Sequence, residues 1–148
     1  MAIFVINEWL WADSAGDNGP QAQNHAFNII TMLAASDHQI AVIEGSPFDR
    51  KAWNICKSTD TIISSIARTF VLGLRQNSNR CLILKPESVA PFPEVLAPNV
   101  KLGDRYLVQT QLTLPGAILV TTDEALCEAV KDAGFACLLR NEFLNTYF

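Results

Sequence analysis

The sequence has few of the residues that soft metal sites and disulfide frameworks require. It contains four cysteines and two histidines among 148 residues. No two cysteines form a C-x-x-C pair and neither histidine lies near a cysteine in the sequence, so the spacing typical of a zinc site is absent. Isolated cysteines of this kind are typical of free buried thiols in a reducing compartment.

The chain also lacks the patterns of nucleotide-binding, membrane and strongly basic proteins. Neither G-x-x-x-x-G-K nor G-x-G-x-x-G occurs, so no phosphate-binding loop is predicted. The net charge of -4 excludes binding of nucleic acid through an overall positive charge, although a local basic groove stays compatible with it. No apolar run reaches the roughly 18 residues of a membrane span, and the start of the chain lacks the basic region of a secretory signal. We therefore expect a cytoplasmic protein that does not enter a membrane.

What the chain does have is enough apolar sequence for one core. Hydrophobic residues make up 49% of it, and its length fits a single domain over residues 1–148. Continuous apolar runs predict strands at 2–7, 38–45, 80–85, 116–123 and 135–139. Helical spacing of apolar residues predicts helices at 21–36, 46–58, 60–78, 104–115 and 123–134. Strands that alternate with helices favour an α/β fold, a three-layer sandwich with a central parallel sheet of four to five strands.

Two segments carry no regular pattern. Residues 12–20, "ADSAGDNGP", are rich in Gly, Asp and Asn and predict a loop. Residues 86–98 hold four prolines and are also predicted to be mostly loop, with no evident chemistry. The closing residues 140–148 predict a final helical turn or a tail.

Acidic side chains stand at the predicted carboxyl ends of the strands, where open parallel sheets bind ligands. They comprise Glu8 after the first strand, with Asn7 beside it, Glu44 after the second, Asp49 in the next helix, Asp123 after the fourth, and Asp104 at the start of the helix before it. Taken singly, Asp49, Asp104 and Asp123 are more typical of helix caps. Gathered at one edge, carboxylates repel one another, and a divalent cation relieves the repulsion. Oxygen ligands favour Mg²⁺ or Mn²⁺, which can activate water for attack on a phosphodiester.

The stretch "GDRYLVQTQLTLPGAILVTTDEALCEAVKDAGFACL" resembles the PIN-domain family. Asp104 opens a helix, a turn contains Gly116, a strand ends in Thr121-Thr122-Asp123, and Gly134 follows the next helix. The start "FVINEWLW" and the tail "NEFLNTYF" also resemble the family's first strand and closing segment. The resemblance implies a PIN-like fold and a Mg²⁺- or Mn²⁺-dependent endoribonuclease with a cluster of three or four acids. For small members it also implies a toxin with an antitoxin-type protein partner.

Carried over by position, the family pattern matches Asp104 and Asp123 well and the other two acids less well. Asn7 stands where the family's first strand ends on an Asp, and Glu8 is one residue beyond, which on a strand faces the opposite side. Asp49 is the acid nearest to the family's second position, with Glu44 as the alternative. The resulting prediction assigns catalytic roles to Glu8, Asp49, Asp104 and Asp123. It assigns metal binding to Asn7, Glu8, Asp104 and Asp123, and substrate contacts to Arg105, Thr121 and Thr122.

Other functions fit the same sequence. A PIN-like module that binds RNA or a protein without cleavage is favoured by Asn7 and by the acidic pI of about 5.0. Another doubly wound protein, receiver-like or nucleotide-binding, fits the element order but lacks a phosphate loop. Trp9 and Trp11 are predicted to lie in the core or at an interface, which leaves a homodimer open. The first hypothesis is the ribonuclease, with RNA as substrate.

Overall fold

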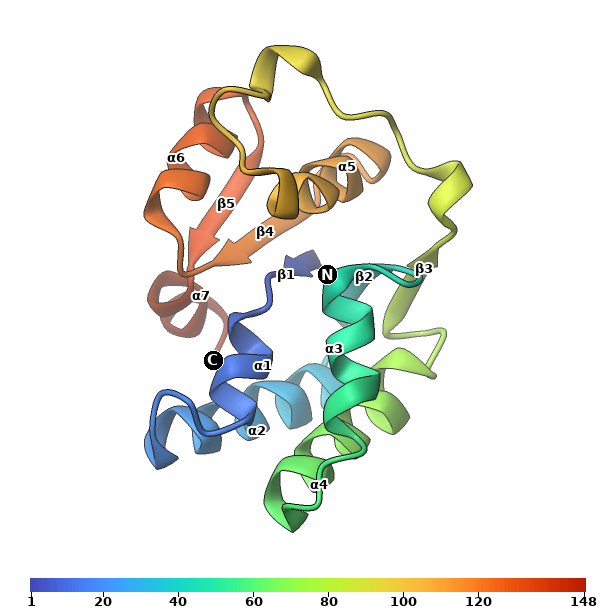
Figure 1. Ribbon diagram of the computed structural model, residues 1–148, viewed down its shortest axis with the longest axis vertical. Helices are drawn as coiled ribbons and strands as arrows, with labels where there is room; N and C mark the ends of the chain where they lie inside the picture. The colour runs from blue at the N-terminus through green and yellow to red at the C-terminus, as the bar shows by residue number, and fades with distance from the viewer.

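A five-stranded parallel sheet lies between two layers of helices in the computed structural model, which describes all 148 residues (Figure 1). The strands are β1 (Ile3–Ile6), β2 (Gln39–Ile43), β3 (Cys81–Leu84), β4 (Ile118–Thr121) and β5 (Ala136–Leu139). The helices are α1 (Trp9–Ser14), α2 (Pro20–Ala35), α3 (Pro47–Ile55), α4 (Thr61–Phe70), α5 (Arg105–Thr113), α6 (Glu124–Asp132) and α7 (Arg140–Tyr147). A π-helical turn (Val71–Arg75) extends α4, and single 3₁₀ turns form at Pro86–Ser88, Glu94–Leu96 and Leu102–Asp104. The predicted α/β sandwich with a parallel sheet is confirmed.

The strand order creates a crevice at the middle of the sheet. The order is β3-β2-β1-β4-β5, and every neighbouring pair is parallel. The chain therefore adds β2 and β3 on one side of β1, then crosses back and adds β4 and β5 on the other side. Connections that leave β1 and β4 in opposite directions open a crevice between their carboxyl ends, which is where proteins of this architecture bind ligands.

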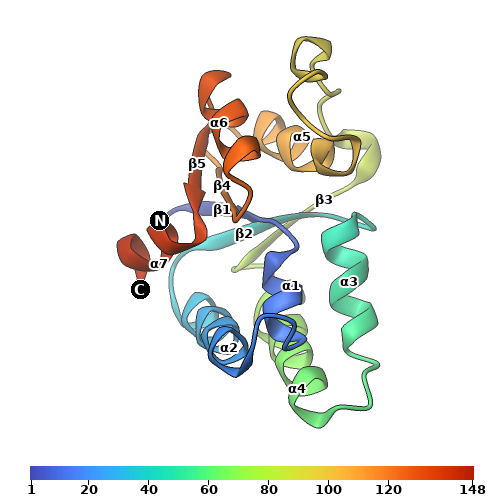
Figure 2. The same cartoon turned by 60° about the vertical axis from the view of Figure 1, so that its left-hand side comes forward.

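Alternate side chains of each strand enter different layers of the core. Phe4 and Ile6 of β1 belong to a larger core cluster of 20 buried residues, built mainly with α1, α2, α3, α4 and α7. Val5 belongs to a smaller core cluster of 11 buried residues, built mainly with α5 and α6. Figure 2 shows α5 and α6 on one side of the sheet and α1, α2 and α4 on the other. The period-two pattern of β1 thus divides its side chains between the two helical layers.

The helix ends follow from local sequence. Ser46 accepts a hydrogen bond from the Asp49 N–H at 3.4 Å and is followed by Pro47 at the first position of α3. This is the N-cap and proline arrangement that the sequence predicted. Gly134, with φ of +89°, ends α6 in the left-handed conformation that glycine adopts without strain.

Two segments are more ordered than predicted. Residues 12–14 are not loop but the last turn of α1, whose six residues are too few to show helical periodicity. Trp9 and Trp11 are buried in that helix, so of the two predicted locations, core or interface, they occupy the core. The closing residues form α7, which packs Phe143 and Tyr147 edge-on against Phe4. Tertiary apolar contacts, which the local sequence does not show, stabilise both helices.

The proline-rich connection runs beside α5 and away from the sheet edge, as the yellow segment of Figure 1 shows. Ala90 ties it to that helix: its N–H donates to Thr113 Oγ1 at 2.9 Å and its carbonyl accepts from Gln109 Nε2 at 3.1 Å. Val100, near its end, is buried in the smaller core cluster. The segment thus covers α5 before the chain reaches Asp104.

No helix of this protein is long and apolar enough to cross a membrane. All four cysteines are free, and three of them are buried.

Candidate active site

Asn7 joins the two strands that border the crevice. Its backbone N–H donates to the Val120 carbonyl at 3.0 Å, and its side-chain Nδ2 donates to Thr121 Oγ1 at 3.1 Å. Its Oδ1 accepts the Glu8 N–H at 2.7 Å. Nδ2 thus helps to hold β1 against β4 while Oδ1 is engaged by the next residue, and the predicted role as a metal ligand competes with these hydrogen bonds.

Thr121 and Asp123 form the β4 side of the crevice. Thr121 is fully buried, and its Oγ1 also accepts the Asp123 N–H at 3.1 Å. Asp123 caps α6 by accepting the Leu126 N–H on Oδ1 at 3.1 Å, while its Oδ2 makes no hydrogen bond within the protein. One carboxylate oxygen thus stabilises the helix, and the other is free for a ligand.

Asp104 lies close to two other acids. It precedes α5 but makes no side-chain capping hydrogen bond. Burial raises the pKa of its carboxyl, the negative charges of Asp123 and Glu8 raise it further, and Lys101 opposes the rise. The charges of Glu8 and Asp123 thus act on Asp104, and we call these three predicted acids the acidic trio.

The acidic trio is not a ready-made metal cage. No group of three or more Asp, Glu, His or Cys side chains is arranged so that it could hold a metal ion as it stands. The cation nearest to Glu8 is Lys51, whose Nζ lies 3.5 Å from Glu8 Oε1. The donors are carboxylate oxygens, the type that Mg²⁺ and Mn²⁺ prefer. The chemical type of the donor atoms therefore fits such an ion, but the three side chains would have to move closer together to coordinate it.

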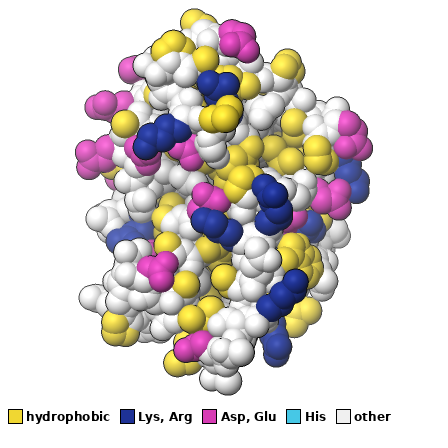
Figure 3. All heavy atoms as spheres, viewed as in Figure 1, with side chains coloured by type: hydrophobic (Ala, Val, Ile, Leu, Met, Phe, Trp, Pro, Cys, Tyr) yellow, Lys and Arg dark blue, Asp and Glu magenta, His cyan; other side chains and the backbone are white.

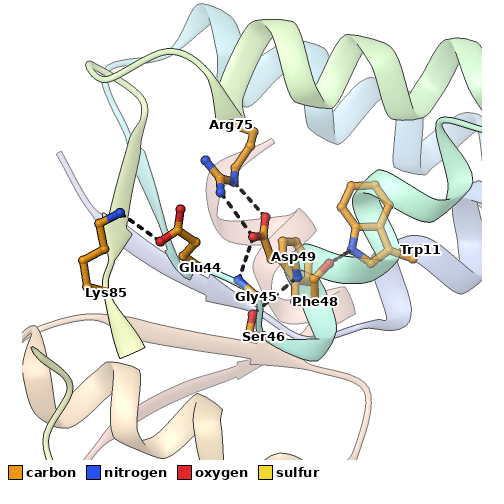
Figure 4. A network of polar contacts seen from close by, with 8 residues as sticks. All are labelled: Trp11, Glu44, Gly45, Ser46, Phe48, Asp49, Arg75 and Lys85. Atoms are coloured by element: carbon orange, nitrogen blue, oxygen red, sulfur yellow. Dashed lines mark hydrogen bonds and ion pairs between the residues drawn. The ribbon is translucent and has the colours of Figure 1, made fainter. Parts of the chain in front are cut away.

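Asp49 is paired with an arginine, Arg75 (Figure 4). Arg75 donates from Nε to Asp49 Oδ1 at 2.7 Å and from an Nη atom to Oδ2 at 3.2 Å, and the Gly45 N–H donates to Oδ2 at 3.0 Å. The side chains of Arg75 and Asp49 are only 10% and 4% exposed. Burial acts to raise the pKa of Asp49, but the hydrogen bonds and charge of Arg75, with the Gly45 N–H, outweigh it and lower that pKa.

The alternative second acid is also paired. Glu44 accepts from Lys85 Nζ at 2.9 Å, and both side chains are exposed. Neither Glu44 nor Asp49 contributes to the rise in the pKa of Asp104. Asp49 and Glu44 thus each have a protein cation, as Glu8 has in Lys51, whereas no ion pair is formed by Asp104 or Asp123.

Tyr106, on the first turn of α5, is a feature of the crevice that the sequence did not single out. Burial raises the pKa of its phenol, and the negative charges of Glu8 and Asp104 add to the effect. The nearby Phe48 backbone N–H partly opposes this rise. It makes no hydrogen bond of good geometry, so the buried hydroxyl has no partner. In the sequence, Tyr106 was only one apolar position of an amphipathic helix, two residues after Asp104.

A cavity of about 550 Å³ opens near the ends of β4 and β5, lined among others by Trp9, Asp13, Thr122, Glu124, Arg140 and Asn141. The acidic trio does not line it. Asp13 is buried and accepts from Arg140 at 2.8 Å and from Asn18 at 2.7 Å. Asp13 and Arg140 are 127 residues apart in the chain, so no local pattern predicts their pairing.

The three predicted substrate contacts have different surroundings. Thr121 is buried and engaged by Asn7, so a substrate does not reach it. Thr122 is exposed and lines the cavity. The Arg105 guanidinium lies 4.8 Å from the ring centre of Phe92, and its buried Nε has no hydrogen-bond partner. Of these residues, Thr122 is the one most open to a ligand beside the acids.

Charge on the face seen in Figure 3 is mixed: acidic and basic side chains alternate around its middle and do not separate into patches. No protein-family model, curated protein or solved structure shows a significant match to this chain. The fold and the crevice thus define an α/β protein with an acidic site at the sheet switch point, and its membership of a family stays a prediction from motifs.

Proposed function

We propose that this protein is a PIN-like, Mg²⁺- or Mn²⁺-dependent endoribonuclease that hydrolyses RNA phosphodiester bonds at the crevice between β1 and β4. The observation that carries the proposal is the environment of Asp104: burial raises its pKa, and the charges of Asp123 and Glu8 raise it further. Carboxylates that repel one another in a partly buried crevice attract a divalent cation. The switch point of an open parallel sheet is the usual place for such a site.

In this proposal Asp104 and Asp123 hold the ion, and Glu8 completes the set. A bound ion of this class supplies Lewis-acid stabilisation of a phosphate and a water activated for attack. Asn7 and Thr121 keep the ends of β1 and β4 at a fixed separation through their hydrogen bond, so the acids approach from defined positions. Lys51, once released by Glu8, is a cation at the rim that can contact an RNA phosphate.

A toxin role with an antitoxin-type partner is part of the same proposal. A groove of about 530 Å³ lies between α2 and α4, away from the acids, and exposes Phe27 and Ile62. Exposed apolar side chains in a groove offer a surface to a partner protein or to a second copy of the chain. The four free thiols support a cytoplasmic, reducing location.

The direct test compares RNA cleavage by the wild type and by Asp123→Asn with Mg²⁺ and with Mn²⁺. Asparagine caps helices as well as aspartate does, so α6 is retained while a charged ligand is lost. We expect a loss of about 10³-fold in rate, since a metal contributes several kcal/mol to such a reaction. Asp132→Asn, an exposed acid on the same helix, is the matched control and should cleave like the wild type. Equal cleavage by wild type and Asp123→Asn, or none by the wild type with either ion, would refute the proposal.

The second candidate is a PIN-like module that binds RNA or protein without cutting. The pairing of Glu8 with Lys51 and of Asp49 with Arg75 favours it, because two of the four predicted acids have protein cations. Titration calorimetry with Mn²⁺ separates the two functions. Binding that Asp104→Asn removes supports the nuclease, and the absence of heat at millimolar Mn²⁺ supports the module.

A further inference from the structure

The cations of this chain are unevenly distributed along it. Between Arg50 and Lys85 lie seven of its eleven Lys and Arg residues and only one of its fifteen Asp and Glu residues. This segment, which includes most of α3 and all of α4 and β3, therefore has a net charge of +6 in a chain whose total is -4. A basic region within an acidic chain is the charge pattern that indicates a polyanionic ligand.

Three of these cations are exposed and have no acidic partner. Arg50, Lys57 and Arg68 are exposed, and none of them takes part in the four ion pairs of the structure. Arg50 lies near the start of α3, where the helix dipole disfavours a cation, so helix stability does not account for it. These side chains are thus free to pair with an anion outside the chain.

The exposed face of α3 carries two of the three cations and a tryptophan. Positions 50, 53, 54 and 57 follow helical spacing, so Arg50, Trp53 and Lys57 lie along one face, with Asn54 beside them. The buried residues of the helix are Phe48, Asp49 and Ala52. In Figure 3 the charge is mixed around the middle of the visible face, and below the middle the charged side chains over α3 are basic.

Trp53 is an exposed aromatic ring with a neighbour that holds it. It is 39% exposed, whereas Trp9 and Trp11 are only 7% and 2% exposed. The guanidinium carbon of Arg75 lies 5.9 Å from its ring centre, and Arg75 is itself fixed by Asp49. An aromatic ring between cations is the arrangement on which proteins stack the bases of single strands. It favours a nucleic acid over an acidic peptide, which has no base to stack.

We propose that this face of α3 binds single-stranded RNA, with Arg50 and Lys57 contacting phosphates and the Trp53 indole stacking on a base. The proposal deepens the proposed function and rests on it for the choice of RNA. The face is continuous with the crevice, because Lys51, the neighbour of Arg50 on α3, lies 3.5 Å from Glu8. Binding by this face needs no metal ion, so it is measurable apart from cleavage.

The test measures binding of a labelled oligouridylate of about 12 nucleotides, by fluorescence anisotropy in EDTA at several salt concentrations. Arg50→Gln and Lys57→Gln should each weaken binding several-fold. Each should also reduce the slope of the logarithm of the binding constant against that of the salt concentration by about 0.7, the value of one phosphate contact on a single strand. Lys131→Gln, at an exposed cation of α6 on the other side of the sheet, is the matched control and should bind like the wild type.

The tryptophan supplies a second readout. Trp53→Ala should weaken binding about 5- to 100-fold through the loss of stacking and leave the salt slope unchanged. Because Trp9 and Trp11 are buried, RNA that stacks on Trp53 should quench the tryptophan emission of the wild type. Trp53→Phe keeps an aromatic ring, so it should bind RNA with a smaller loss than Trp53→Ala and show no quenching. Urea unfolding of each variant, expected to match the wild type, shows that the fold is intact.

The outcomes separate this inference from the proposed function. RNA binding that the α3 variants leave unchanged overturns the inference, and cleavage by the same proteins leaves the nuclease standing. Binding that the variants lose, in a protein that cleaves no RNA with Mg²⁺ or Mn²⁺, supports the inference and overturns the nuclease. Equal binding of polyglutamate, without quenching, assigns the face to an acidic protein and overturns the inference. Tighter binding of oligothymidylate than of oligouridylate overturns the choice of RNA.

Discussion

Asp49 and Asp104 are the same residue type near the same edge of the sheet, yet their surroundings are opposite. Asp49 is enclosed by the two hydrogen bonds of Arg75, and its pKa is lowered although burial acts against that. Asp104 makes no capping hydrogen bond and is half-buried, and its pKa is raised by that burial and by the charges of Asp123 and Glu8. The first carboxylate has its counter-charge within the protein, and the second does not.

This difference indicates that one carboxylate at this edge of the sheet contributes to stability and that the other is available for a ligand. A carboxylate that is fully paired contributes to the folded state and has no capacity left for a ligand. A carboxylate that faces other acids costs stability, and such a cost is typical of sites that a ligand later relieves. Substitutions at either carboxylate, or at the residues around it, test this difference.

The largest effect is expected from removing the cation of the paired acid. Arg75→Met should leave Asp49 as a buried charge without a partner and lower the free energy of unfolding by about 3–5 kcal/mol. Urea unfolding at pH 7 measures it. Lys85→Met, which breaks the exposed pair with Glu44, is the control and should change stability by less than about 1 kcal/mol. Similar small changes in both variants would mean that the buried pair is not a stabilising contact.

The next effect is the pH dependence that Asp49 produces. Because folding lowers its pKa, Asp49 contributes stability above the ordinary aspartate pKa of about 3.9, and that stability is lost as the pH falls through the lowered value. The wild type should thus lose more stability between pH 7 and pH 2 than Asp49→Asn does. Urea midpoints measured across this range test it, and parallel curves for the two proteins would contradict it.

A smaller effect of opposite sign is expected at Asp104. Folding raises its pKa, so its ionised form costs stability above that pKa, and the cost vanishes once the pH is below the ordinary value. Asp104→Asn should therefore be more stable than the wild type at pH 7, by about 0.5–1 kcal/mol, and no more stable at pH 3. Saturating Mn²⁺ should reverse the order at pH 7, since only the wild type gains binding energy. Thermal unfolding with and without Mn²⁺ measures both, and a less stable Asp104→Asn without metal would refute the repulsion.

The smallest effect concerns the cation beside the acidic trio. Lys51→Met removes the ammonium that pairs with Glu8 and should strengthen Mn²⁺ binding about two- to fivefold, the worth of an exposed ion pair. Lys57→Met removes the same charge at another exposed position, a little further along the chain, and serves as the control. Calorimetry that shows the same affinity for both variants would mean that Lys51 does not compete with the ion.

The sequence was sufficient for the architecture. Alternating apolar and amphipathic segments predicted the parallel sheet, and they also predicted that Asp104 precedes a helix and that Asp123 follows β4. The partner of Asp49 could not be predicted in the same way, because Arg75 is 26 residues away on a π-helical turn. The surroundings of Tyr106 could not be predicted either, since its buried hydroxyl without a partner is a property of the folded chain.

The crevice also depends on the order in which the chain is made. Asn7 and Thr121, whose hydrogen bond joins its two walls, are 114 residues apart. A growing chain that has completed β1, β2 and β3 holds Glu8 but neither Asp104 nor Asp123, so the acidic site does not exist until β4 has left the ribosome. Under the proposed ribonuclease function, a nascent chain would therefore lack the assembled acidic site until β4 has been made.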